Sequence, residues 1–223
     1  MKILILDAGP LISLSLNGLL HTIEILKEKF SDVVFVVTPS VKKETIDNAL
    51  LIKKYKLEAV KLQTMIDKKI LNLSSDFVSN NALDKEEKRI LKLTNSSYKA
   101  DGKFLSIVHS GEASCLAFAN LCKCDNLIVI DERATRLFTE SPENLKQIME
   151  RKLHTPVLMS SKNFREFEHF KFIRSTELVY FAYKNNLYDY KKNNSTLDAL
   201  LYALKYSGVA ISSKEINEMK LLD

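Results

Sequence analysis

The sequence predicts an α/β domain in which helices cover a parallel β-sheet. Three short runs of uninterrupted apolar residues are typical of strands buried on both faces, and they lie at 3–6, 33–37 and 127–130. A weaker run at 170–173 predicts a fourth strand. Segments of helical pattern lie between and after these strands, at 11–30, 41–71, 112–121, 133–138 and 177–185. Strands that alternate with helices favour a layered fold with right-handed crossovers.

Two stretches depart from this alternation. Residues 74–101 are polar and hold a run of mixed charges, which predicts a helical insertion with a solvated face. Residues 140–169 contain Pro142 and Pro156 and predict an excursion with an edge strand. We therefore expect a main domain over residues 1–190, with insertions near 74–101 and 140–169.

A C-terminal helical extension is expected over residues 191–223. Four leucines recur there at the spacing of one helix face, namely Leu197, Leu200, Leu201 and Leu204. Ser195 or Thr196 is placed to cap this helix, and Gly208 is placed to end it. Residues 211–222 predict a second helix, so the chain is expected to close with a helical pair.

The composition is that of a folded globular chain. Hydrophobic residues make up 46% of the 223 residues, and the net charge of +5 suits an anionic partner without requiring one. No apolar stretch approaches the roughly 18 residues of a membrane-spanning helix. Asp7 also ends the first apolar run before it reaches the length of a signal-peptide core. Three cysteines close together favour reduced thiols. We expect a cytoplasmic protein with no membrane partner.

Acidic residues follow the predicted strands. Asp7 comes directly after the first strand, Glu44 lies shortly after the second, and Asp131 follows the third. Glu112 stands at the start of the helical pattern at 112–121. Ligands of open parallel sheets bind beyond the carboxyl ends of the strands. We therefore expect these four side chains to meet at that edge.

Four carboxylates at one place need a positive charge. One pair about 4 Å apart repels by about 4 kcal/mol at an effective dielectric constant of 20. All-oxygen ligation selects hard cations such as Mg²⁺ or Mn²⁺, and Mg²⁺ commonly binds substrate phosphate oxygens. The acids therefore indicate a metal site that acts on a phosphodiester. Taken singly, Glu112 and Asp131 also have a structural interpretation, because acids are favourable at helix N-termini.

Four blocks of the sequence resemble the ordered blocks of PIN-domain proteins. They are ILDAGPLI at 5–12, TPSVKKE at 38–44, SGEA at 110–113 and IDERATR at 130–136. The likeness covers residues 1–48 and 104–138, and more weakly 170–185. It implies a Rossmann-like, three-layer α/β/α sandwich and a Mg²⁺- or Mn²⁺-dependent nuclease, usually one that cuts RNA.

The resemblance also implies the catalytic residues and metal ligands, which would be Asp7, Glu44, Glu112 and Asp131. The fourth block reads Asp131-Glu132 where a double Asp is common, and we favour Asp131 because it is the nearer of the two to the strand. RNA is the expected partner, cut to leave a 5′-phosphate and a 3′-hydroxyl. A homodimer, an antitoxin protein, and a role of the insertions as lid, dimer contact or substrate-selecting wall stay open.

Three further residues are candidates for substrate binding. Arg133 and Arg136 lie at i and i+3, so they reach one helix face, where they contact a backbone phosphate or pair with the acids. Thr176 belongs to a hydroxyl pair with Ser175 that reads as a helix cap, and the resemblance places this pair beside the metal.

Two other classes of protein compete with the nuclease. One is a catalytically silent PIN-like protein that binds nucleic acid or serves as a scaffold, in which the acids persist for stability. The other is a Rossmann nucleotide-binding enzyme. It is the weaker alternative, because the turn Asp7-Ala8-Gly9-Pro10 lacks the glycine pattern that cradles a dinucleotide.

Overall fold

The computed structural model describes residues 1–222 and confirms the predicted α/β class. Its main sheet is parallel throughout and runs in the order β3-β2-β1-β6-β8. The strands are β1 (Lys2–Leu6), β2 (Val33–Val37), β3 (Leu71–Leu73), β6 (Asp125–Val129) and β8 (Phe172–Ile173). The central strand β1 pairs on both sides, with Ile3 opposite Val34 and Asn126. A central strand with helices on both faces of the sheet buries the side chains on both of its sides, so its sequence is continuously apolar.

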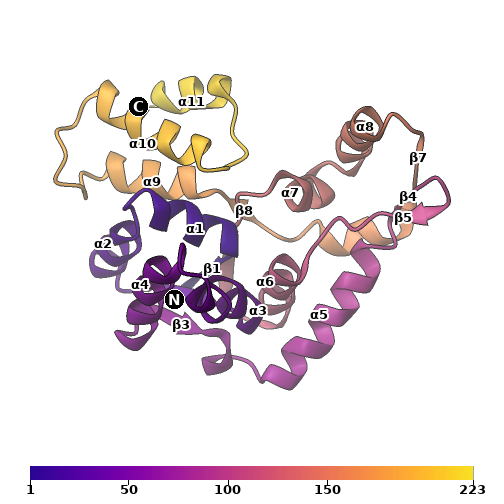
Figure 1. The fold of residues 1–223 in the computed structure, drawn as a ribbon, viewed down its shortest axis with the longest axis horizontal. Helices are drawn as coiled ribbons and strands as arrows, with labels where there is room; N and C mark the ends of the chain where they lie inside the picture. Colours follow the sequence, from indigo (N-terminus) through magenta and orange to yellow (C-terminus); the bar gives the residue numbers. More distant parts are fainter. Residues whose placement is uncertain (223) are drawn as a thin grey trace.

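Helices lie on both faces of this sheet, as the sandwich architecture requires. One layer contains α1 (Ala8–Leu16), α2 (His21–Lys29) and α9 (Ser175–Lys184), which contact one another. From the other side α6 (Ser110–Leu121) packs on β1 and β6, and α5 (Asn80–Thr94) lies along α6 (Figure 1). The segment between β2 and β3 forms α3 (Pro39–Lys42), a π-helical turn (Lys43–Asp47) and α4 (Lys56–Asp67).

Two long helices expected from the sequence are interrupted. The expected helix at 11–30 breaks between α1 and α2, where Gly18 adopts a φ of +68° that an L side chain rarely adopts. The expected helix at 41–71 ends early, and its last residue begins β3. That strand has only three residues, too few for periodicity to reveal.

The two insertions join to form an arm, here defined as residues 95–105 and 133–170. It contains α7 (Arg133–Glu140), α8 (Pro142–Leu153) and a second, antiparallel sheet of β5 (Lys103–Phe104), β4 (Tyr98–Ala100) and β7 (Val157–Met159). The strand expected within 140–169 therefore lies in this small sheet and not at the edge of the main one. Figure 1 shows the arm projecting to the right of the main sheet.

An aromatic cluster gives the arm its own core. The ring of Tyr98 is fully buried and lies 6.1 Å from that of Phe138 and 5.7 Å from that of Phe164, centroid to centroid. Its hydroxyl donates to the carbonyl of Pro142 at 2.9 Å. Burial of large aromatic rings from β4, α7 and the segment before β8 holds the three pieces of the arm together.

The C-terminal pair forms as expected, with α10 (Asn194–Tyr206) and α11 (Ser213–Lys220) packed on each other and α10 also packed on α9. The cap of α10 differs from the expectation, because Asn193 and not Ser195 or Thr196 accepts the amide hydrogen bond. Gly208 follows the helix with a φ of +107°. Within the described residues, no helix combines the length and the apolar character needed to span a membrane.

Candidate metal centre

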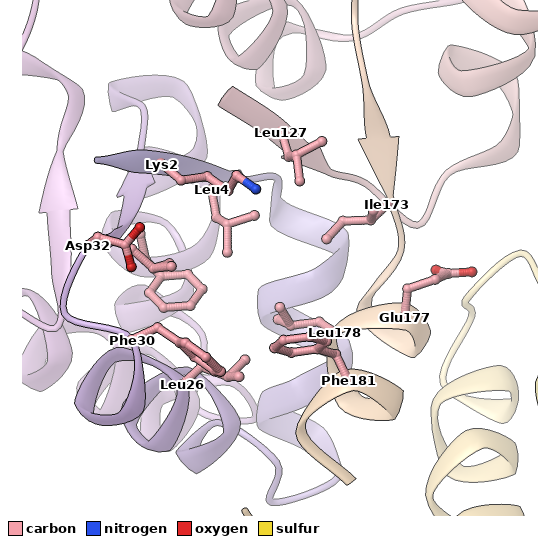
Figure 2. A pocket seen from close by; sticks show the side chains of 12 residues that line it. Lys2, Leu4, Leu26, Phe30, Asp32, Leu127, Ile173, Glu177, Leu178 and Phe181 are labelled. Atoms are coloured by element: carbon pink, nitrogen blue, oxygen red, sulfur yellow. The ribbon is translucent and has the colours of Figure 1, made fainter. Parts of the chain in front are cut away.

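An apolar hollow beside the main sheet lies away from the predicted acids. It has a volume of about 440 Å³ and opens between α2 and α9, near the amino ends of β1 and β2. Figure 2 shows Leu4, Leu26, Phe30 and Phe181 around it. None of the four predicted acids lines this hollow. The acids belong to the opposite, carboxyl end of the strands, where functional groups of parallel sheets are expected.

Three of the four acids are buried at that carboxyl end. Asp7 ends β1 and precedes α1, Asp131 follows β6 by two residues, and Glu112 lies in the first turn of α6. Asp7 is 5% exposed, Asp131 is 3% exposed and Glu112 is 6% exposed. The N–H of Asp7 donates to the carbonyl of Val129 at 3.1 Å, which fixes the end of β1 against the end of β6. Glu44 lies in the π-helical turn after β2 and is exposed.

Two glycines show how the acids are grouped. A methyl group placed on Gly111 would lie 3.3 Å from Oε2 of Glu44 and 3.4 Å from Oδ1 of Asp7. A methyl group on Gly9 would lie 3.6 Å from Cβ of Asp131 and 3.8 Å from Oδ2 of Asp7. Asp7 is therefore the central member, with Glu44 on one side and Asp131 on the other. The absence of side chains at the glycines leaves room beside its oxygens.

Burial and mutual repulsion make ionisation of these acids unfavourable. Burial, followed by the negative charges of Glu112 and Glu44, raises the pKa of Asp7 to about 7. Burial also raises the pKa of Glu112 and of Asp131. Among the side chains that the structure describes, no Lys, Arg or His forms an ion pair with any of the four. The charge of His109 lowers the pKa of Glu112, but burial outweighs it.

Hydrogen bonds hold Asp131 in one orientation. Its Oδ1 accepts from the N–H of Ser175 at 2.8 Å, and its Oδ2 accepts from the hydroxyl of Ser175 at 2.9 Å. The hydroxyl of Ser13 on α1 lies 3.2 Å from the same Oδ2. Asp131 therefore joins the start of α9 to α1, a structural role that is complete without a metal.

Glu112 is held in a similar way. Its Oε2 accepts from the N–H of His109 at 2.7 Å, which closes a capping box at the start of α6. Its Oε1 accepts from the hydroxyl of Thr135 on α7 at 2.9 Å. Thr135 was not singled out by the sequence, because nothing local to it indicates a partner so distant in the chain. Ser175 belongs to the hydroxyl pair that the resemblance placed beside the metal, and in the structure it contacts Asp131.

The three predicted substrate-binding residues lie in different settings. Arg133 is exposed at the start of α7. Arg136 donates to the carbonyl of Ala210 at 3.2 Å, and Thr176 is fully buried with its hydroxyl 3.2 Å from Oε2 of Glu177. Arg136 and Thr176 thus have structural partners, and the substrate contacts expected of all three stay predictions. Glu132 is exposed and caps α7, which agrees with the preference for Asp131.

Sequence reasoning missed a carboxylate at the rim of the acid group. Glu87 on α5 accepts from the hydroxyl of Ser110 at 2.5 Å and from that of Ser40 at 3.0 Å. Ser110 begins α6 two residues before Glu112, and Ser40 lies on α3 four residues before Glu44. The inserted helix α5 is thereby fastened to both elements that carry these acids.

The C-terminal extension also reaches the acid group. The N–H of Ala210 donates to the backbone carbonyl of Asp131 at 3.2 Å. The carbonyl of Ala210 accepts from Arg136 and from Arg174, each at 3.2 Å. Arg174 also pairs with Glu177 at 2.5 Å and with Glu215 of α11 at 2.7 Å. Arg136 and Arg174 therefore have partners other than the four acids.

The carboxylate oxygens of the four acids are of the kind that binds a hard divalent cation, but in this structure they do not all point to one place. Within the described residues, no three Asp, Glu, His or Cys side chains stand together as a ready set of metal ligands. Glu112 and Asp131 direct their oxygens to hydrogen-bond donors, whereas Asp7 and Glu44 face the space beside Gly111. A cation would offset both the burial and the repulsion that raise the pKa of Asp7, and its all-oxygen surroundings fit Mg²⁺ or Mn²⁺.

Comparisons of the chain with models of known protein families, with curated proteins and with solved structures find no match. The assignment of a function therefore depends on the geometry of the acid group.

Proposed function

We propose that this chain is a Mg²⁺- or Mn²⁺-dependent endoribonuclease of the PIN-like type. One observation carries the proposal: Asp7 is buried beside Glu44, Glu112 and Asp131 at the carboxyl end of a parallel sheet, and no Lys, Arg or His side chain that the structure describes forms an ion pair with these acids. A protein that buries several acids together either protonates them or binds a cation. Two of these acids are further oriented by hydroxyl groups from other elements, as a positioned site requires.

Each acid has a distinct role in the proposed reaction. A divalent cation bound here would supply a Lewis acid that activates water and offsets charge on the phosphoryl oxygens. Asp7 and Glu44 would hold it, with Glu112 and Asp131 completing the negative surroundings. Ser13 and Ser175 keep Asp131 in place, and Thr135 does the same for Glu112. Glu44 is the exposed member and is placed to accept a proton from the attacking water.

The proposal is tested by cleavage of labelled single-stranded RNA in the presence of Mn²⁺ or Mg²⁺. We expect products with a 5′-phosphate and no cleavage in EDTA. Asp7→Asn and Glu112→Gln should each lower the rate by at least about 100-fold, because each removes a negative charge from the site. The matched control is Asp189→Asn, which neutralises an exposed aspartate far along the chain. An RNA panel left intact with both ions, or equal rates for Asp7→Asn and the unaltered chain, contradicts the proposal.

A catalytically silent nucleic-acid-binding protein is the second candidate. It is favoured by the complete hydrogen bonding of Glu112 and Asp131, which explains both acids through the fold alone. This alternative expects RNA binding that is equal in EDTA and in Mn²⁺, and no cleavage. The same panel of RNAs, run in parallel as a binding assay, separates the two functions.

A further inference from the structure

The outer face of the small sheet in the arm carries large exposed apolar side chains. Phe104 is 62% exposed and Leu158 is 70% exposed. Both stand directly opposite Lys99, Phe104 on one neighbouring strand and Leu158 on the other. Because directly opposed residues of an antiparallel sheet share a face, these three side chains form one row, which we call the arm-tip row.

The opposite face of the same sheet fixes the arm-tip row in place. Tyr98, Ala100 and Val157 are buried against the aromatic core of the arm. The turn between β4 and β5 is the dipeptide Asp101-Gly102, with φ of +47° and +77°. Two residues with positive φ form the tight hairpin turn that matches strand twist. The row is thus carried by a short, anchored hairpin and not by a loose loop.

The charge beside the arm-tip row is mainly positive. The Nζ of Lys99 lies 5.6 Å from the centroid of the Phe104 ring. Lys103 is exposed next to Phe104, and among the described side chains neither lysine forms an ion pair. The nearby acid, Asp101, lies 3.5 Å from the hydroxyl of Thr155. An exposed ring with an unpaired cation over it is complementary to a flat, apolar group joined to an anion.

We propose that the arm-tip row binds unpaired nucleotides of a single-stranded RNA. A base stacks on Phe104, Leu158 packs against its edge, and Lys99 contacts the adjacent phosphate. Stacking on aromatic side chains combined with cationic contacts to the backbone is how proteins hold single strands without regard to sequence. The inference rests on the proposed nuclease function and adds to it a site that selects unpaired RNA.

The position of the row suits a contact several nucleotides from the acids. Glu87, which accepts from Ser110 at the start of α6, lies within α5, and β4 begins four residues after α5 ends at Thr94. The seven residues from Glu87 to Thr94 rise about 10 Å at 1.5 Å per helical residue, and the row lies beyond that end of α5 (Figure 1). An RNA bound at both places would extend along the arm.

The test uses the absence of tryptophan from the chain. In the Phe104→Trp variant the new indole reports base stacking by loss of its fluorescence. A twelve-nucleotide oligouridylate is titrated in EDTA, so that no cleavage occurs. We expect saturable quenching, which a second change, Lys99→Gln, shifts to higher RNA concentration by several-fold. The matched control is Tyr206→Trp, at an 81% exposed aromatic position on α10, and it should show no saturable quenching.

A second measurement removes the stacking ring. Phe104→Ala should weaken the binding of the oligouridylate by about 5- to 100-fold, the range found for loss of one stacked base. Equal affinity for Phe104→Ala and the unaltered chain, or no quenching in Phe104→Trp, overturns the proposal. So does sedimentation that shows a dimer dissociated by Phe104→Ala, because the row would then be covered by a second copy.

The two proposals fail in different ways. If quenching is absent while Mn²⁺-dependent cleavage persists, the arm-tip row is not an RNA site and the nuclease assignment stands. If quenching is present but no RNA is cut, the row binds RNA and the nuclease assignment is wrong.

Discussion

Asp7 has the most unfavourable surroundings of the four acids for a negative charge. Its pKa is raised to about 7 by burial and by the charges of Glu112 and Glu44. An acid whose pKa is higher in the folded than in the unfolded chain lowers stability progressively as the pH rises between the two values. The ionised Asp7 should therefore lower the free energy of unfolding of the metal-free protein at neutral pH, and a bound cation should restore it.

Asp7→Asn should stabilise the metal-free protein at pH 7.5. The substitution replaces the buried carboxylate by a neutral amide of similar shape. The rise in the pKa of Asp7 from 3.8 to about 7 corresponds to about 2–4 kcal/mol of stability at neutral pH. The free energy of unfolding by urea, measured in EDTA, checks this. The gain should vanish near pH 4, where Asp7 is protonated in the folded chain, and Asp189→Asn should show no gain at either pH. A destabilised Asp7→Asn at pH 7.5 in EDTA contradicts the account.

The sequence could predict the acids, but only some of the residues that hold them. Asp7 and Asp131 stand directly after apolar strands, a position that the chain order reveals. Ser175 was expected at the site only through the resemblance, and it lies 44 residues from Asp131 in the chain. Ser13 is unremarkable in its own segment, and only the folded chain brings it to Asp131, 118 residues away. Side chains such as Ser13 and Thr135, which orient the acids across the fold, carry no local signal.

Ser175→Ala should destabilise the protein by about 1–2 kcal/mol. It removes the hydroxyl that donates to Oδ2 of Asp131 and leaves the backbone N–H as the donor from α9. Urea unfolding measures the cost. Ser195→Ala, an exposed serine in the first turn of α10, is the control and should stay within about 0.5 kcal/mol. Equal stabilities for the two variants would mean that the Ser175 hydroxyl does not hold Asp131.

Among the elements, α5 shows best how an insertion can become part of a site. The mixed charges at 85–89 predicted a solvated helix, and most of them do form exposed pairs such as Lys88 with Asp84. Glu87 departs from this pattern, because it accepts hydrogen bonds from Ser40 and Ser110. The sequence predicted the helix from its composition. The contact of one glutamate with two distant serines depends on how α5 packs on α6.

Glu87→Ala should loosen α5 without unfolding the sheet. The loss of hydrogen bonds to a partly exposed carboxylate is expected to cost about 1 kcal/mol. Amide hydrogen exchange should rise in α5 and at the start of α6, while the amides of β1 and β6 stay protected. Asp84→Ala on the same helix is the control, since it removes only an exposed pair. Unchanged exchange in α5 for Glu87→Ala would contradict the fastening role.

At the scale of the whole molecule, three parts of the chain meet around the acids. The strand ends supply Asp7 and Asp131, α5 fastens the elements that carry Glu44 and Glu112, and the C-terminal extension hydrogen-bonds to the backbone of Asp131. Uninterrupted apolar runs predicted four of the five strands of the main sheet, and apolar periodicity predicted the helical pair. Neither pattern could predict the small antiparallel sheet, because its strands have only two or three residues and β4 pairs with β7 across more than 50 positions.

The stability of the metal-free protein should pass through a maximum near pH 5. Burial raises the pKa of Asp7 to about 7 and also raises the pKa of Glu112 and of Asp131, so stability grows as the pH falls and these carboxylates become protonated in the folded chain. Burial of Glu215 opposes its ionisation, but hydrogen bonds from Ser212 and Arg174 outweigh burial and lower its pKa to about 2. The stability that Glu215 contributes is therefore lost as the pH falls below about 4.5. Melting temperatures measured in EDTA from pH 3 to 8 check this, and a continuous rise from pH 5 to 8 contradicts it.

The most direct test of the account is the position of a metal ion in crystals grown with Mn²⁺. We predict an anomalous-scattering peak beside Asp7, with carboxylate oxygens of Asp7 and of at least one of Glu44, Glu112 and Asp131 about 2.0 to 2.3 Å from the ion. The peak should be absent in crystals of Asp7→Asn. A fully formed acid group with no ion in millimolar Mn²⁺, or an ion bound only elsewhere, would contradict the metal-dependent nuclease.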